Sequence, residues 1–259
     1  MQDKKVILIC GYPKSGTTWA TRLVAELVNC PADGFWGTQS LSLVAEGSDR
    51  VSQYVCYKSH HLYGEVGEVD DQPIYKIIHI VRDPRDITVS GAHHFPLLTS
   101  TLHKVRVVFG LTPLIGKQLN AMLLKTMSFD KRLSLMIEVL IKGHRKYIGC
   151  RSPWHEYVAS FVGKDVLTIR YEDLLQDGEQ TVEHILEHLG IAITDHRVST
   201  ALSNQSFDTR KQEFLEKGAK YKYNHLRIGQ SGGWKKVLNP SQIKLINTEL
   251  NEWIKKFNY

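Results

Sequence analysis

The stretch from Gly11 to Trp19 combines residue types that bind anions. It reads Gly-Tyr-Pro-Lys-Ser-Gly-Thr-Thr-Trp and follows an apolar run at residues 6–10, which is typical of a buried strand. Glycines permit a tight turn that leaves backbone N–H groups available to an anion at the start of a helix. We therefore predict a phosphate or sulfate site here, where the side chains add further donors from Lys14, Ser15, Thr17 and Thr18 around Gly16.

A second group of residues follows another apolar run, at residues 74–81. Arg82 ends this predicted strand, and Asp83 with Pro84 forms a favoured N-cap and first position of a helix. Ser90 lies about two turns into that helix. One guanidinium and one hydroxyl suit a second phosphate. The alternative is that Arg82 forms an ordinary ion pair with Asp86 or another acid.

The elements that must position these groups follow from the hydrophobic pattern. Apolar, β-branched runs recur at residues 6–10, 55–59, 74–81 and 166–170, and helical patterns follow three of them. This pattern predicts an α/β fold with a parallel central sheet flanked by helices, in a single P-loop-like domain over residues 1–259. The first helix is expected from residue 17 to about 29. Ligands of open parallel sheets bind outside the carboxyl ends of the strands, where both motifs lie.

The stretch from Ile87 to Phe129 contains no Asp or Glu, and its lysines and arginine are interleaved with Leu, Val, Phe and Met. We expect residues 96–150 to form a helical substrate lid or acceptor region. Two other interpretations stay open, because the same composition fits a surface for an anionic or amphipathic substrate and a helical pair packed on the sheet.

Composition limits the possible partners and location. The net charge is +6, but basic and acidic residues are interspersed, so an anionic small molecule is favoured over nucleic acid. The four cysteines are scattered without metal-ligand or C-x-x-C spacing, and no apolar run is long enough to span a membrane. We expect a cytoplasmic protein without a metal, and the sequence leaves the oligomeric state open.

The two anion motifs together resemble the cytosolic-type sulfotransferase family. Members of that family use 3′-phosphoadenosine 5′-phosphosulfate (PAPS) and release 3′-phosphoadenosine 5′-phosphate (PAP). The resemblance implies that the first motif holds the 5′-phosphosulfate through Lys14, Ser15, Gly16, Thr17 and Thr18, with Trp19 beside the adenine. It also implies that Arg82 and Ser90 hold the 3′-phosphate.

The family's catalytic histidine lies in a Lys-x-His pattern at a strand end, and this chain has Tyr57-Lys58-Ser59-His60-His61. Strand alternation puts Lys58 and His60 on one face and His61 on the other. The resemblance implies that His60 is the general base, because a neutral imidazole suits proton removal near pH 7. His61 remains the alternative base.

Three later segments extend the resemblance towards the nucleotide. Tyr171 stands in a Tyr-Glu-Asp sequence after a predicted strand, and Phe207 in a Ser-Phe pair, so the resemblance places both at the nucleotide. The family pattern Arg-Lys-Gly-x-x-Gly-Asp-Trp-Lys appears as Arg-Ile-Gly-Gln-Ser-Gly-Gly-Trp-Lys from Arg227 onwards. Arg227 and Gly229 are expected to bind the 3′-phosphate, although Ile228 and Gly233 replace a lysine and an aspartate.

The implied function is transfer of a sulfuryl group from PAPS to the hydroxyl of a small or amphipathic organic acceptor. Lys14, Lys58 and His60 are the expected catalytic residues, because such a transfer needs charge stabilisation and a base. Two alternatives stay open. A catalytically inactive nucleotide-binding scaffold is suggested by the altered C-terminal pattern, whereas a P-loop kinase or NTPase would require the lysine to follow the second glycine, which it does not.

Overall fold

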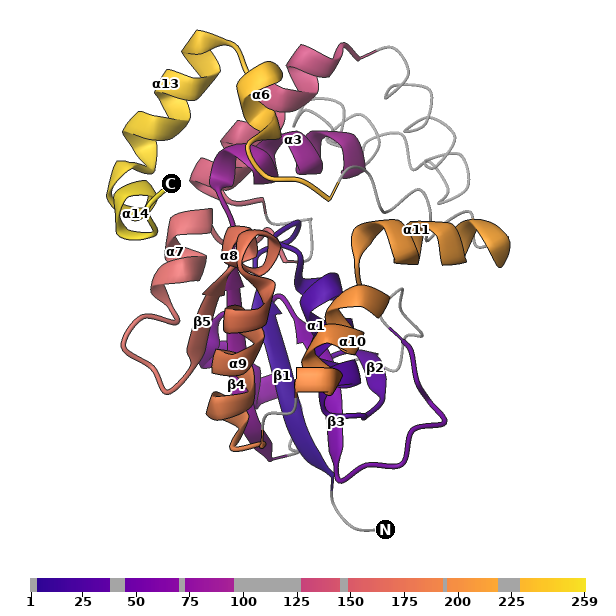
Figure 1. Ribbon diagram of the computed structural model, residues 1–259. Coiled ribbons are helices and arrows are strands. Elements are labelled where there is room, and N and C mark those ends of the chain that lie inside the picture. Colours follow the sequence, from indigo (N-terminus) through magenta and orange to yellow (C-terminus); the bar gives the residue numbers. More distant parts are fainter. Residues whose placement is uncertain are drawn as a thin grey trace, which may run out of the picture.

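A computed structural model describes residues 4–37, 45–69, 73–95, 127–144, 149–192, 195–218 and 229–259 of the chain. Within these ranges, five parallel strands form one sheet in the order β2-β3-β1-β4-β5 (Figure 1). The strands are β1 (Lys5–Gly11), β2 (Ala32–Phe35), β3 (Tyr54–Ser59), β4 (Ile74–Val81) and β5 (Leu167–Arg170).

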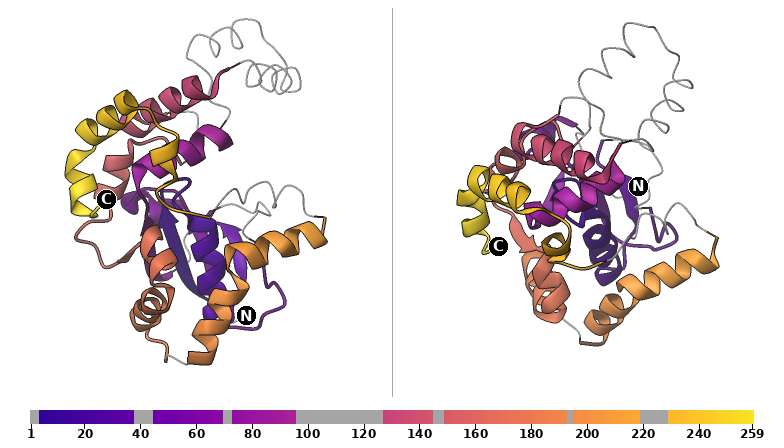
Figure 2. Two further views of the ribbon diagram at one scale, coloured as in Figure 1. Left: turned by 45° about the horizontal axis from the view of Figure 1, so that its top comes forward. Right: turned by 90° about the horizontal axis from the view of Figure 1, so that it is seen from above.

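Helices cover both faces of the sheet, as Figure 2 shows from two further sides. The helices that follow the N-terminal strands are α1 (Thr17–Leu27), α2 (Val66–Val69) and α3 (Pro84–His94). Those of the second half are α6 (Phe129–Lys142), α7 (Trp154–Ala159), α8 (Tyr171–Gln176), α9 (Gly178–Leu189), α10 (Asp195–Asn204), α11 (Phe207–Glu216), α13 (Pro240–Glu249) and α14 (Asn251–Lys256). Single 3₁₀ turns lie at η1 (Tyr63–Glu65) and η2 (Gly233–Lys236).

The central strand β1 separates two hydrophobic cores. Val6 and Leu8 pack with the core that contains α3, α6, α7 and the C-terminal helices, whereas Ile7 and Ile9 pack with α1, α9 and α10. Because side chains alternate across a strand, a run that is apolar at every position is buried on both faces. The predicted α/β architecture is thus confirmed, with a parallel sheet flanked by helices.

The sequence pattern located four of these strands and missed β2. Its sequence, Ala-Asp-Gly-Phe, is short and contains two residue types that are rare in strands, so it carries no strand signal. The β2 strand forms because it pairs with the outer edge of β3, where Phe35 lies opposite Lys58. The helix expected from residue 17 to about 29 ends at Leu27, and Asn29 takes a left-handed conformation (φ 50°).

The helix after β4 begins as the sequence predicts. Asp83 is its N-cap and accepts a hydrogen bond from the Arg85 backbone N–H (2.8 Å), and Pro84 takes the first helical position. In the predicted lid region, α6 buries Leu133 and Met136 in the core. Residues 96–126 and 145–148 lie outside the described residues, so a lid there stays a prediction. No helix within the described ranges is long and apolar enough to cross a membrane.

Candidate functional site

The turn between β1 and α1 has the backbone geometry of an anion cradle. Lys14 (φ 74°) and Gly16 (φ 89°) both take left-handed conformations, and no side chain caps the start of α1. A Cβ atom at Gly16 would lie 2.5 Å from Cδ2 of Tyr171, so a glycine is required there for space as well as conformation. The first N–H groups of a helix have no partner within the helix, so they can bind a ligand.

Two hydroxyl groups in this cradle are buried without a hydrogen-bond partner among the residues that the structure describes. They are Ser15 Oγ and Thr17 Oγ1, on side chains that are 0% and 3% exposed. A buried hydroxyl without a partner costs free energy, so such groups mark a place where a ligand or water completes the bonding. These two donors fit the oxygens of a phosphate or sulfate group.

Lys58, at the end of β3, faces the cradle. Its Nζ donates a hydrogen bond to Thr18 Oγ1 (2.9 Å) and lies 4.5 Å from the centre of the Phe35 ring. The side chain is 8% exposed, and burial, with the nearby charges of Lys14 and Arg22, lowers the pKa of Lys58 to about 7. No carboxylate among the described residues is a hydrogen-bond partner of this buried ammonium group, which is therefore suited to an anionic ligand.

His60 is joined to the same turn by its ring. Its Nδ1 lies 2.5 Å from the carbonyl oxygen of Gly11, and a carbonyl can only accept a hydrogen bond. Nδ1 therefore carries the proton, which leaves Nε2 as the basic nitrogen of the neutral ring. Burial and the charge of Lys58 hold the pKa of His60 well below its usual value. A Cβ atom at Gly149 would lie 2.8 Å from Cβ of His60, so this glycine allows the ring its place.

His61 lies in a different environment. Its Nδ1 is 3.1 Å from Ser59 Oγ, and its nearest charged groups include Glu65 and Arg151. Burial lowers the pKa of His61 too. Its ring is hydrogen-bonded to Ser59, the last residue of β3, and not to a residue of the cradle. The geometry therefore connects His60, and not His61, with the cradle backbone.

Arg82 bridges the cradle and a distant segment. Its Nη1 donates to the Lys14 carbonyl (3.1 Å) and its Nη2 to the Gln230 carbonyl (2.9 Å), while the guanidinium lies 4.1 Å from the centre of the Tyr171 ring. Within the part of the chain that the structure describes, Arg82 makes these contacts and no ion pair with Asp86 or another acid. Ser90 lies half-buried two turns along α3, the helix that follows Arg82.

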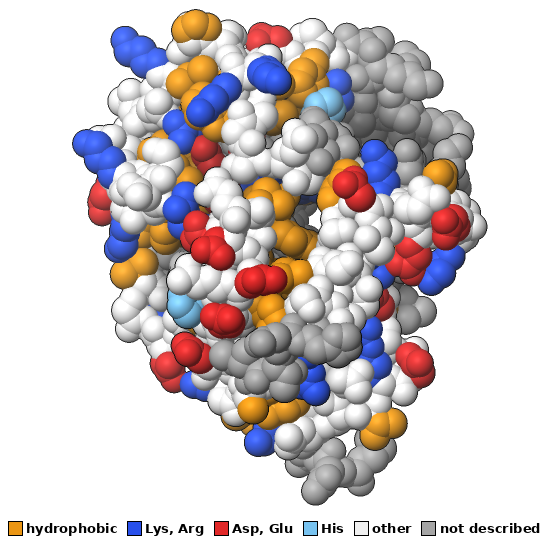
Figure 3. All heavy atoms as spheres, in the orientation of Figure 1, with side chains coloured by type: hydrophobic (Ala, Val, Ile, Leu, Met, Phe, Trp, Pro, Cys, Tyr) orange, Lys and Arg blue, Asp and Glu red, His pale blue; other side chains and the backbone are white. Residues whose placement is uncertain are grey.

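Aromatic side chains gather beside the cradle. The rings of Trp19 and Tyr171 meet edge to face with centres 5.6 Å apart, and Trp19 Nε1 donates to the Gln205 carbonyl (2.8 Å). Phe207 follows two residues later and packs so closely against Gly229 that no side chain would fit there. In the space-filling view, this face is hollowed near the loop after β1, with hydrophobic side chains along the hollow (Figure 3). Arg227 and Ile228 lie outside the described residues.

Sequence reasoning overlooked two residues of this site, Phe35 and Gly149. Phe35 contacts both Lys58 and the His60 ring, whose centre is 5.7 Å away. It lies on β2, the strand without a sequence signal, so nothing in the pattern could have found it. Gly149 is far from His60 in the chain and only the fold brings them together.

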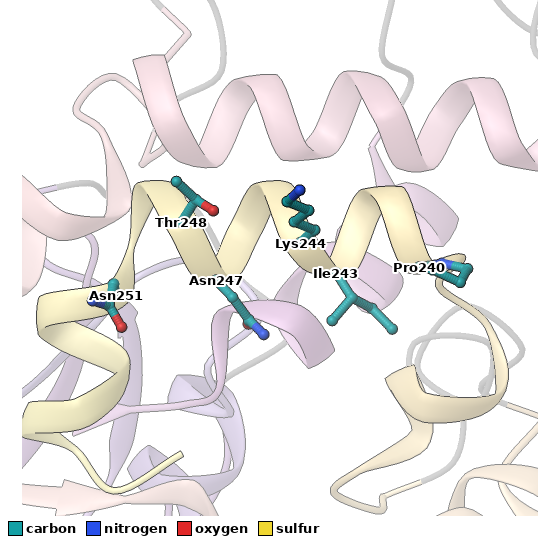
Figure 4. Close-up of a pocket in the computed structure, with 6 residues that line it drawn as sticks. All are labelled: Pro240, Ile243, Lys244, Asn247, Thr248 and Asn251. Carbon is teal, nitrogen blue, oxygen red and sulfur yellow. The ribbon is translucent and has the colours of Figure 1, made fainter.

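A separate depression runs along the C-terminal helices, and Figure 4 shows its lining. The lining residues belong to α13 and the start of α14: Pro240, Ile243, Lys244, Asn247, Thr248 and Asn251. They do not come from the strand ends that carry the cradle. Within the described ranges, no group of three or more His, Cys, Asp or Glu side chains is arranged to hold a metal ion.

Comparisons with solved structures agree with the fold. Mouse sulfotransferase SULT7A1, complexed with PAP, superposes with a TM-score of 0.66 at 21% identity and covers 97% of this chain and 85% of its own. Retinol dehydratase, in complex with androsterone and the inactive cofactor PAP, superposes with a TM-score of 0.61 at 18% identity, covering 96% and 80%. At these identities the likeness concerns the fold.

Sequence comparisons identify the family. Sulfotransferase 2A1 of Macaca fascicularis is 26% identical over 277 residues, which cover 97% of this chain and 85% of that protein. The 3-alpha-hydroxysteroid sulfotransferase of Cavia porcellus is 23% identical over 268 residues, which cover 93% of this chain and 80% of that protein. The model of the sulfotransferase domain family matches residues 4–258, nearly the whole chain. The chain therefore belongs to the sulfotransferase domain family, and it has the fold of the solved sulfotransferase that superposes on it.

Proposed function

We propose that this sulfotransferase transfers a sulfuryl group from PAPS to the hydroxyl of a small or amphipathic organic acceptor, with His60 as the general base. The observation that carries the proposal is the hydrogen bond from His60 Nδ1–H to the Gly11 carbonyl. This bond selects the tautomer in which Nε2 carries no proton, and it holds the His60 ring against the backbone of Gly11, the first residue of the cradle.

The residues present fit PAPS. The buried hydroxyls of Ser15 and Thr17 and the ammonium group of Lys58 supply donors for the phosphosulfate, together with Lys14, Gly16 and Thr18. On the nucleotide side we assign the adenine to Trp19, Tyr171 and Phe207, and the 3′-phosphate to Arg82, Ser90, Arg227 and Gly229. Two structural neighbours are complexed with PAP, which supports PAP as the ligand of this site. When bound, PAPS supplies the sulfuryl group, and PAP is the product.

The protein groups have distinct tasks in this mechanism. His60 Nε2 takes the proton of the acceptor hydroxyl, which makes the oxygen a better nucleophile. Lys14 stabilises negative charge on the departing phosphate, and Lys58 stabilises the group that is transferred. Bound phosphosulfate would bring negative charge to the cradle, which would favour the imidazolium form of His60 and so oppose the lowering of its pKa by burial and Lys58.

The acceptor class rests on two supports. Androsterone bound to a structural neighbour and the 3-alpha-hydroxysteroid named for a relative are both small, largely apolar hydroxyl compounds. The acid-poor stretch from residue 87 to 129 is also rich in apolar residues, as such an acceptor requires. We propose a cytoplasmic location as well, which imaging of the tagged protein in its host would test.

Calorimetric titration with PAP and, separately, with ATP and magnesium tests the donor assignment. We expect PAP to bind at least tenfold more tightly than ATP, because only the first carries a 3′-phosphate for Arg82. Preference for ATP, or binding of neither nucleotide, would overturn the proposal. Turnover with PAPS and a panel of phenols, steroid alcohols and sugars, followed by PAP release, then defines the acceptor.

A further inference from the structure

One buried carboxylate holds the segment of residues 229–236, which we call the C-terminal loop. Asp86, in the first turn of α3, is 4% exposed. Its Oδ2 accepts a hydrogen bond from the Gly232 N–H (2.6 Å), and its Oδ1 accepts one from the Trp234 N–H (3.1 Å). Gly232 takes a left-handed conformation (φ 76°), which turns neighbouring N–H groups towards one anion. Both bonds are charge-assisted and therefore strong.

Two arginines, one in the first turn of α3 and one just before the helix, contact the C-terminal loop at two further points. Arg85, whose guanidinium is held by the Asp83 carboxylate (2.8 Å), lies 4.1 Å from the centre of the Trp234 ring. Arg82 donates to the Gln230 carbonyl (2.9 Å). Three successive side-chain contacts from one helix end thus fix the path of the loop backbone.

The C-terminal loop and the residues that hold it are in contact with the candidate nucleotide site. Gly229, at the start of the C-terminal loop, packs against the Phe207 ring, and Arg82 also binds the carbonyl of Lys14 in the cradle. A Cβ atom at Gly233, where the family pattern has aspartate, would lie 3.8 Å from Asp86 Oδ1. In this chain, the carboxylate that accepts hydrogen bonds from the Gly232 and Trp234 N–H groups is that of Asp86, in α3.

We propose that Asp86 is a positioning residue, which holds the C-terminal loop over the 3′-phosphate side of the nucleotide site. The inference rests on the proposed function, since it assigns a task to Asp86 in PAPS and PAP binding. Replacement by asparagine keeps the size of the side chain but places an NH₂ group against one of the two N–H donors. Asp86 touches neither the cradle hydroxyls nor His60, so the transfer step is unaffected.

The test compares wild type with Asp86→Asn and a matched control, Asp130→Asn. Asp130 is also a first-turn aspartate, of α6, and accepts a hydrogen bond from Gln242 Nε2 (3.0 Å) away from the loop. We expect Asp86→Asn to weaken PAP binding and raise the KM for PAPS about tenfold to a hundredfold, the loss of one or two charge-assisted bonds. The kcat stays within about threefold, and hydrogen exchange accelerates in residues 229–236. Asp130→Asn leaves all four quantities unchanged.

Unchanged PAP affinity and unchanged exchange in Asp86→Asn would overturn the inference. If wild type fails to bind PAP, the proposed function is wrong, and exchange in the ligand-free protein still decides whether Asp86 holds the loop. If Asp86→Asn does not fold, Gly232→Pro removes both the N–H partner of the 2.6 Å bond and the left-handed conformation of Gly232, and leaves α3 intact. A folded Gly232→Pro protein with wild-type PAP affinity would equally contradict the proposal.

Discussion

The two ends of the candidate site are assembled in different ways. The cradle end, which comprises residues 11–18 with Lys58 and His60, is built at the tips of the neighbouring strands β1 and β3, whose register pairs Cys10 with Ser59. The nucleotide end, which comprises Trp19, Tyr171, Phe207 and the C-terminal loop, comes from segments far apart in the chain. Side-chain contacts such as those of Arg82 and Asp86 hold it together.

The different construction of the two ends suggests which of them controls turnover and which controls ligand affinity. Backbone hydrogen bonds of a sheet are numerous and cooperative, so the cradle end is held with little dependence on any one side chain. The nucleotide end depends on a few side chains, each of which can be lost singly. Substitutions at the cradle end should therefore change turnover most, whereas those at the nucleotide end should change ligand affinity or stability.

The largest expected effect is on turnover in His60→Asn. Asparagine retains an N–H group near the position of Nδ1 but has no basic nitrogen, so we expect kcat to fall by about a hundredfold or more. The affinity for PAP, measured by calorimetry, should change by less than about threefold. His61→Asn is the matched control and should keep turnover. A loss in His61→Asn with full activity in His60→Asn would exchange their roles.

Gly16→Ala should affect both ends, because Gly16 lies between the cradle and the Tyr171 ring. The added methyl group meets that ring and forces a left-handed conformation on alanine, so we expect PAP affinity to fall about tenfold or more and stability to fall by about 1–3 kcal/mol. Calorimetry and urea unfolding measure the two effects.

Gly163→Ala is the control for Gly16→Ala, because it tests the effect of the left-handed conformation without a steric contact. Gly163 is also left-handed (φ 72°), but a Cβ atom there would have nothing within 4 Å. We expect it to lose about 1 kcal/mol of stability and to keep its affinity for PAP. Equal affinity losses in the two variants would show that the contact with Tyr171 is irrelevant to binding.

The pH dependence of PAP binding should report on Lys58. Its pKa of about 7 means that the ammonium form dominates below pH 7 and is lost as the pH rises. An anion binds the ammonium form more tightly, so affinity should fall with increasing pH, by up to about tenfold per unit between pH 7 and 9. Lys58→Arg stays charged and should give a flatter profile. If calorimetry gives the same pH dependence of PAP affinity in wild type and Lys58→Arg, another group is responsible for it.

The smallest effect is expected for Trp19→Phe at the nucleotide end. Phenylalanine keeps an aromatic ring beside Tyr171 but loses the 2.8 Å hydrogen bond to the Gln205 carbonyl, which should lower the free energy of unfolding by about 1 kcal/mol. Urea unfolding measures it. Trp253→Phe, where the ring stacks on Phe257, is the control and should lose less. A larger loss of unfolding free energy in Trp253→Phe than in Trp19→Phe would show that the Trp19 hydrogen bond does not stabilise this end of the site.

The sequence by itself determined the cradle and its setting. The run before Gly11, the glycine spacing around Lys14, and the Asp83-Pro84 helix start are local signals, because each depends on residues a few positions apart. Strand alternation also predicted Lys58 and His60 on one face, although β3 ends at Ser59, one residue before His60. These expectations concern short segments whose conformations are nearly independent of the rest of the chain.

Only the tertiary structure decided which partners these segments meet. The bond between His60 and Gly11, the edge strand that carries Phe35, and the grip of Asp86 on the C-terminal loop join residues between 25 and 148 positions apart or depend on strand pairing. Such contacts form when helices and strands pack their apolar faces, and many distant partners are compatible with the same local pattern. The sequence therefore fixes which groups can bind an anion, and packing decides which of them act together.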